Sequence, residues 1–326
     1  MRLNKKHLVY RTIFVIPGLK MYQVSTSTGV ACMYIDGVFS GGGIKGFALI
    51  GAYAEIEKRG FRFKRVAGTS AGSIVAALIA AKYTSEEIYQ LLDELDLEKF
   101  LDSRTTYIPL AVTKWIFLYW RLGLYKGDEL EKWVEEKLAA RGIRKFSDLP
   151  QQELRVIASD LTNGRLVVLP DDLIHYGIDP GSFSIAKAIR MSCSLPYFFE
   201  PVKLHTRGET SIIVDGGVLS NFPMWLFDKD NVKKARPVLG VQLSHNIIDP
   251  PKNKIKNAIQ MYEALFETMK DAHDARYISR KHAKNIIFIP TEGALTTEFQ
   301  LTQEKKHALV QLGEKCANQF FSQWAY

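Results

Sequence analysis

The spacing of apolar residues predicts that strands and helices alternate along the chain. Residues 34–40, YIDGVFS, form a short and mostly apolar run that ends at a cluster of glycines, a pattern typical of a buried strand followed by a tight loop. Apolar residues then recur from Leu49 to Ile56 at the spacing of one helix face, and Gly60 stands where that helix should end. This region therefore predicts a strand, a loop and a helix, in that order.

The same order repeats directly downstream. Residues 63–68, FKRVAG, predict a second short strand, and residues 71–82, AGSIVAALIAAK, are apolar on all sides, so we expect a buried helix there. Together these elements make a βαβ unit that begins a mostly parallel sheet. Further strands are expected at 154–159, 165–170, 211–215, 237–243 and 285–290, and further helices at 85–95, 128–140, 184–192, 255–283 and 303–323.

Two segments stand apart from this alternation, although the length of 326 residues fits one large α/β domain. Residues 1–32 combine a basic stretch with an apolar run too short for a signal peptide, so we treat them as an N-terminal extension and residues 33–326 as the folded domain. Residues 100–127 are dense in bulky aromatics. This fits a core helix packed on the sheet, and it equally fits a lid or a pocket wall that faces lipid.

Charge and cysteine content narrow the class of partner. Lys and Arg number 43 against 35 Asp and Glu, a net charge of +8, and the basic residues are scattered in short groups. With no nucleic-acid-binding motif beside them, they favour a solvated surface or contact with anionic lipid head groups, and we expect no nucleic acid partner. Cys32, Cys193 and Cys316 lie far apart, without a disulfide framework or a zinc spacing, which favours a cytoplasmic protein. No apolar run is long enough to span a bilayer.

The residues Gly68-Thr69-Ser70-Ala71-Gly72 match the pattern G-x-S-x-G. A predicted strand precedes this motif and a predicted buried helix follows it, which is the setting that exposes a serine hydroxyl at a sharp turn. The start of the helix also places partial positive charge where an alkoxide would form. Ser70 is therefore the candidate nucleophile, and a turn that merely needs small residues is the alternative.

A glycine-rich loop, Ser40-Gly41-Gly42-Gly43-Ile44-Lys45-Gly46, precedes the first helix. It lacks the spacing of a phosphate-binding P-loop, and no acidic residue ends the next strand as a dinucleotide site requires. Bare backbone amides at a helix start suit a developing oxyanion. Because the two loops lie one βαβ unit apart, parallel strands should bring Gly42 and Gly43 to face Ser70.

The proton acceptor for Ser70 stays open between a histidine and a carboxylate. A Ser-His-Asp triad needs a histidine after a late strand, and of the seven histidines only His245 follows a strong predicted strand. Asp215 ends another predicted strand and precedes Gly216-Gly217, and Asp160 is a weaker rival of the same kind. A carboxylate can accept a serine proton if the site brings their pKa values within working range.

The motifs together resemble the patatin-like phospholipases, a family of lipid acyl hydrolases. SGGGIKG is similar to their glycine-rich oxyanion motif, GTSAG to their nucleophile elbow, DGGVLSNFP to their catalytic aspartate block, and residues 187–201 to the segment before that block. The resemblance runs from about Tyr34 to about Gly313 and departs from the family at Ser40, often Asp, and at Lys45, often Arg.

The resemblance implies a three-layer α/β/α sandwich with a central, mostly parallel sheet. It also implies a dyad in which Ser70 attacks and Asp215 is the base, with no metal and no cofactor. Gly41, Gly42 and Gly43 would bind the oxyanion. The supporting motif residues are Lys45, Gly46, Gly68, Gly72, Gly216 and Gly217.

We therefore expect a serine lipid acyl hydrolase of the phospholipase A or lysophospholipase type that works through an acyl-enzyme. Its partners would be a phospholipid or another ester lipid and, peripherally, a membrane surface. A transacylase with the same dyad and a lipid-binding protein with a degenerate site are the alternatives.

Overall fold

The computed structural model describes residues 32–102, 118–206, 208–227, 236–244, 255–256, 258–277, 283–291 and 301–324. Residues 1–31 of the predicted N-terminal extension and residues 103–117 of the aromatic segment lie outside the described residues. Within them, every strand and helix that the apolar pattern predicts is present, with ends that differ by a few residues.

The strands are β1 (Met33–Phe39), β2 (Phe61–Thr69), β3 (Gly123–Tyr125), β4 (Leu154–Asp160), β5 (Arg165–Leu169), β6 (Tyr197–Phe199), β7 (Val202–His205), β8 (Thr210–Asp215), β9 (Val238–Ser244) and β10 (Ile286–Pro290). The longer helices are α1 (Phe47–Lys58), α2 (Ala71–Ala80), α3 (Ser85–Asp93), α5 (Asp128–Ala139), α6 (Ile185–Ser192), α7 (Ala258–Tyr277) and α9 (Gln303–Gln323). Short 3-10 turns include η1 (Gly43–Gly46), η2 (Leu97–Phe100), η5 (Gly216–Val218) and η6 (Met224–Leu226).

The main sheet has the strand order β10-β9-β1-β2-β4-β8-β7, and β5 pairs with β4 outside this path. The five strands from β10 to β4 are parallel, whereas β5, β7 and β8 join by antiparallel pairing. The strands β3, β6 and β7, which sequence analysis did not predict, have three or four residues each. Runs this short carry no recognisable period, so tertiary pairing decides them.

Two apolar cores lie on the two faces of the sheet, because successive strand residues point to opposite sides. Phe39 and Val66 belong to the larger core, which also holds apolar residues of α1, α2, α5, α6 and α9. The neighbouring Val38 and Ala67 belong to a smaller core with Phe222 and other residues of the 222–227 segment. The sheet is therefore the middle layer of three, as expected.

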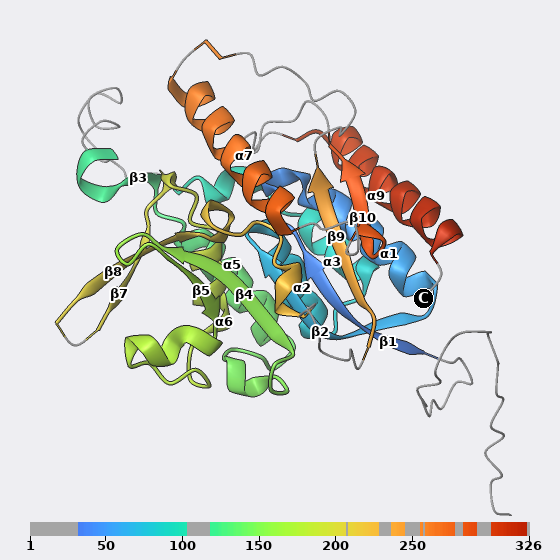
Figure 1. Ribbon diagram of the computed structural model, residues 1–326, viewed down its shortest axis with the longest axis horizontal. Coiled ribbons are helices and arrows are strands. Elements are labelled where there is room, and N and C mark those ends of the chain that lie inside the picture. Colours follow the sequence, from blue (N-terminus) through green and yellow to red (C-terminus); the bar gives the residue numbers. More distant parts are fainter. Residues whose placement is uncertain are drawn as a thin grey trace, which may run out of the picture.

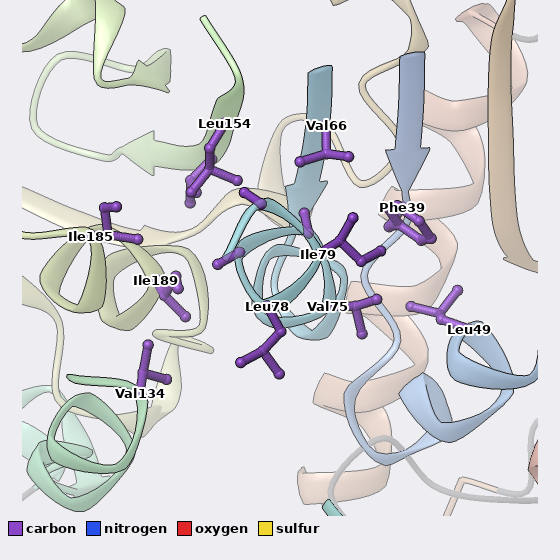
Figure 2. Packing of buried hydrophobic residues seen from close by; sticks show 14 of the residues in the cluster. Phe39, Leu49, Val66, Val75, Leu78, Ile79, Val134, Leu154, Ile185 and Ile189 are labelled. Atoms are coloured by element: carbon purple, nitrogen blue, oxygen red, sulfur yellow. The ribbon is translucent and has the colours of Figure 1, made fainter. Parts of the chain in front are cut away.

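Helix α2 lies at the centre of the larger core, where Val75, Leu78 and Ile79 project toward the surrounding elements (Figure 2). This placement explains why its sequence is apolar all round, since most of the helix is buried in the core and Ala71 and Ile74 line an apolar pocket. Helices α1 and α9 lie side by side at the edge of the molecule, and α7 runs diagonally across it (Figure 1). Gln242, whose neighbour Val241 points into the larger core, hydrogen-bonds Asp274 of α7, so α7 covers the face of the smaller core.

Candidate active site

Ser70 occupies the sharp turn between β2 and α2. Its φ of 51° and ψ of −127° are unusual for a residue with a side chain, and such strain persists only where the surroundings fix it. The Ser70 amide donates to Ser192 Oγ at 2.9 Å, and its carbonyl accepts from the Ser73 amide and the Ser73 hydroxyl at 2.8 and 2.6 Å. The turn is therefore held on both sides.

Gly72 allows α2 to start this close to the sheet. A Cβ added to Gly72 would lie 2.4 Å from the carbonyl oxygen of Phe39 and 2.5 Å from that of Ser40, which are both backbone atoms. Gly68 is crowded in the same way, since its Cβ would lie 2.2 Å from the carbonyl oxygen of Gly72. The glycines that flank Ser70 are thus required by close backbone packing.

The strand register brings Asp215 to Ser70. Residues 156 and 157 of β4 pair with β2 on one edge and β5 on the other, and residues 158 to 160 pair with β5 and β8. Strand β8 therefore pairs with the same edge of β4 as β2 does, beyond the end of β2, and it runs in the opposite direction. Thr69 lies opposite Ile157 and Asp215 lies opposite Ala158, so the two strands end against each other with the serine at one end and the aspartate at the other.

The Asp215 carboxylate is buried and hydrogen-bonded. It accepts from the Gly217 amide at 2.7 Å. Burial raises the pKa of Asp215 to about 6, while the hydrogen bond from Gly217, the neighbouring Ser70 side chain and the charge of Lys270 act to lower it. The group is therefore mostly ionised at neutral pH and is a stronger base than an ordinary aspartate.

The glycine loop passes directly beside Ser70. A Cβ added to Gly41 would lie 3.2 Å from Ser70 Cβ and 2.5 Å from Asn221 Oδ1. The Gly41 amide donates to the Asn221 carbonyl at 3.1 Å, whereas in the described part of the chain the amides of Gly42 and Gly43 donate to no backbone carbonyl. Ser40, where the family often has Asp, is fully buried, and its hydroxyl accepts from the Leu243 amide at 2.9 Å.

An apolar pocket of about 140 Å³ opens beside Ser70 and Asp215. Gly42 and Gly43 form one side of it, and α2 contributes Ala71, Ile74 and Val75. Most of the remaining wall is apolar and comes from the segment around α3, from α5 and from the segment around β6: Leu92, Leu95, Leu97, Phe100, Leu130, Trp133, Leu195, Phe198 and Phe199. Ser70 and Asp215 thus lie at a pocket whose wall suits a hydrocarbon chain.

The other candidate bases lie elsewhere or outside the described residues. Asp160 does not line the pocket. Burial acts to raise its pKa, but hydrogen bonds from Asn163, Tyr176 and Ser211 outweigh this and lower it overall. His175, His205 and His307 are exposed and do not line the pocket, and the side chain of His245 lies outside the described residues.

Four residues at this site were not predicted from the sequence. Cys193 Sγ lies 4.0 Å from the Ser73 hydroxyl, and burial raises the pKa of its thiol to about 12, so it stays protonated. Asn221 positions the glycine loop, and Phe266 and Lys270 of α7 line the pocket. The spacing of 266, 270 and 274 on one face of a predicted helix was the available signal, but the sequence does not show what that face covers.

Two kinds of feature are absent from the part of the chain that the structure describes. It contains no cluster of three or more His, Cys, Asp or Glu side chains placed to hold a metal ion. It also contains no helix that is both long enough and apolar enough to cross a membrane.

Comparison with known proteins assigns the chain to a family. A sequence model described as Patatin-like phospholipase matches residues 37–228, more than half of the chain. The protein is a member of this family. Membership supports a lipid hydrolase activity and confirms the resemblance seen in the motifs.

The chain is also similar to individual relatives and, in its fold, to a solved structure. The chain is 58% identical over 294 residues to the uncharacterized protein YqhO of Bacillus subtilis, a match that covers 90% of this chain and 100% of that protein. It is 30% identical over 195 residues to the cUMP-AMP-activated phospholipase of Escherichia coli, covering 56% of this chain and 54% of that protein. The crystal structure of VipD from Legionella pneumophila has the same fold, with a TM-score of 0.54 and 18% identity over 92% of this chain and 70% of that one.

Proposed function

We propose that the protein is a serine lipid acyl hydrolase of the phospholipase A or lysophospholipase type, with Ser70 as nucleophile and Asp215 as general base. The observation that carries this proposal is the placement of Ser70 and the buried Asp215 carboxylate together at one apolar pocket, where their two strands end against each other. No histidine is needed for proton transfer when a carboxylate beside the serine can accept that proton.

Catalysis would proceed through two transfers at the same serine. Asp215 takes the proton as Ser70 Oγ bonds to the ester carbonyl carbon, and the tetrahedral oxyanion is bound by the amides of Gly42 and Gly43. The protonated Asp215 then gives its proton to the departing alkoxide, which leaves an acyl-enzyme. Water then attacks the carbonyl carbon of the acyl-enzyme as it gives a proton to Asp215. The bond between that carbon and Ser70 Oγ breaks, the fatty acid leaves, and Asp215 returns the proton to Ser70 Oγ.

The backbone amides of the glycine loop have different roles in the proposed mechanism. The Gly41 amide already donates to Asn221, so we assign the oxyanion donors to Gly42 and Gly43 and give Gly41 the role of close contact with Ser70. The acyl chain would enter the pocket between α2, α5 and the segment around β6. This assignment makes the pocket wall the determinant of which acyl chains bind.

A fluorophosphonate probe tests the nucleophile. The wild type should be labelled and should release fatty acid from a mixed lipid extract, and Ser70→Ala should do neither. Asp215→Ala should lose most ester hydrolysis, whereas the matched variant His245→Ala should keep it. Persistent labelling of Ser70→Ala would remove Ser70 from the mechanism, and loss of activity in His245→Ala alone would favour a Ser-His-Asp triad.

We also propose that the protein touches the lipid surface from which it draws its substrate. Residues 118–121 are helical, and Tyr119 and Trp120 in this segment are 75% and 74% exposed. The sequence-predicted Trp115 and Phe117 lie outside the described residues. Replacing Tyr119 and Trp120 by Ser should reduce co-sedimentation with anionic vesicles while fluorophosphonate labelling is kept; unchanged co-sedimentation would refute this contact.

A further inference from the structure

Helix α7 lies outside the part of the chain that the family model matches, yet it closes one side of the active site. Phe266, Lys270 and Asp274 follow one another at intervals of four residues, so they share one face of the helix. Phe266 and Lys270 line the pocket that holds Ser70 and Asp215, and Asp274 accepts hydrogen bonds from Asn221 and Gln242 at 3.2 and 3.0 Å. The face of α7 that meets the site is therefore mostly charged.

Lys270 is the one cationic side chain among the described residues that line this pocket. It is only 7% exposed, and its Nζ forms an ion pair with Glu267 at 3.1 and 3.2 Å from the two carboxylate oxygens. Its Nζ also lies 6.0 Å from the centre of the Phe266 ring. Burying an ammonium group is costly, so its place in the wall of the pocket that also holds the buried Asp215 carboxylate calls for a reason.

We propose that Lys270 is a positioning residue for the dyad, whose charge keeps Asp215 ionised and ready to accept the proton of Ser70. The proposal rests on the proposed function, because it assigns a role to Lys270 only if Asp215 is the base. Lys270 would touch neither the substrate carbonyl nor Ser70; it acts through Asp215 alone.

The charges that face Asp215 have opposite signs and come from several elements. From α7, Lys270 lowers the pKa of Asp215 and Glu267 raises it. At the end of α6, the Cys193 thiol lies beside it in protonated form. Farther away, Lys45 of η1 interacts with Lys270 and Glu267, and Asp274 interacts with Lys270.

Because the charges of Lys270 and Glu267 have opposite signs, neutral variants at these two positions of α7 should shift the pH dependence of catalysis in opposite directions. With the pKa of Asp215 at about 6, kcat/KM for a short-chain ester at pH 6 should be about half its value at pH 8. In Lys270→Gln this ratio should fall below the wild-type ratio, because the carboxylate loses its cation. In Glu267→Gln the ratio should rise above it, and in Lys270→Arg it should return to the wild-type value.

A structural role alone would not produce this pattern. A fold defect would lower activity at both pH values and leave the ratio unchanged, so an unchanged ratio in both Lys270→Gln and Glu267→Gln overturns the proposal. If Lys270→Gln does not fold, the opposite shift in Glu267→Gln and the wild-type ratio in Lys270→Arg remain as tests. Lys64→Gln, an exposed lysine of β2, is the matched control and should leave the ratio and the activity unchanged.

Two further variants separate the possible failures. Burial also raises the pKa of Asp274 to about 6, so Asp274→Asn shows which carboxylate sets the profile. The fall in kcat/KM between pH 8 and pH 6 should persist in Asp274→Asn. If it disappears, the pH dependence does not come from Asp215 and the proposal is overturned. Ester hydrolysis that survives in Ser70→Ala would instead refute the proposed function. That outcome does not depend on the ratio of kcat/KM at pH 6 to that at pH 8, so the two failures can be told apart.

Discussion

Replacing Asp215 by Asn should abolish hydrolysis and stabilise the fold at the same time. The carboxylate is 3% exposed, and its pKa is raised from 3.8 to about 6 by burial. A raised pKa means that the folded state binds more protons than the unfolded state between these two values. The fold therefore loses stability as the pH rises from about 4 to 6, and the full cost is present above this window.

The size of the effect follows from the shift. A difference between 3.8 and about 6 corresponds to about 3 kcal/mol of unfolding free energy at pH 8, since one pKa unit is worth about 1.4 kcal/mol. Integration over the same two values leaves about half of that cost at pH 5. Asn has the shape of the neutral acid and can still accept from the Gly217 amide, so it removes the charge and keeps the hydrogen bond.

Urea unfolding of wild type and Asp215→Asn at pH 8 and pH 5 measures both quantities. We expect the variant to be more stable by up to about 3 kcal/mol at pH 8 and by about half as much at pH 5. Asp274 is present in both proteins, so its own raised pKa cancels in the difference. The reasoning would be refuted if the variant were less stable than wild type at pH 8. It would also be refuted if the difference in unfolding free energy were the same at both pH values.

Two other substitutions test the pocket and the elbow. Ile74→Trp fills the pocket wall beside Ser70, so kcat/KM should fall by about tenfold or more for long-chain esters and much less for acetate esters; an equal loss for both would place the acyl chain elsewhere. Gly72→Ala forces a Cβ to within 2.4 Å of the Phe39 carbonyl oxygen and should destabilise the fold by roughly 2 kcal/mol in thermal or urea unfolding. Gly181→Ala, whose nearest neighbour would be 3.6 Å away, should be tolerated, and similar losses in both variants would mean that crowding at Gly72 is not the cause.

The G-x-S-x-G motif and the glycine loop could be predicted from the sequence because the conformation of each depends mainly on neighbouring residues. G-x-S-x-G between a strand and an apolar helix specifies a strained turn around Ser70, and the structure has that turn. The glycine loop one βαβ unit upstream had to lie beside it, since right-handed crossovers place parallel strands next to each other. A Cβ on Gly41 would indeed lie 3.2 Å from Ser70 Cβ.

Asp215 was a candidate on its sequence, but its contact with Ser70 depends on pairing that no local pattern encodes. Strand β8 reaches the serine only because it pairs antiparallel with β4, beyond the end of β2 on the same edge. The same holds for α7, whose periodicity predicts a helix but not the site that its Phe266 and Lys270 face. Side-chain burial and the resulting pKa of Asp215 follow from those placements.

The strand-helix alternation, the strained serine turn and the glycine loop follow from the sequence alone, because these depend on the backbone preferences and apolar spacing of neighbouring residues. Tertiary packing sets which carboxylate meets Ser70, which apolar segments form the pocket and which charges surround Asp215. These contacts join separate segments of the chain, and they are set by the register of a mixed sheet and by the helix that closes its face.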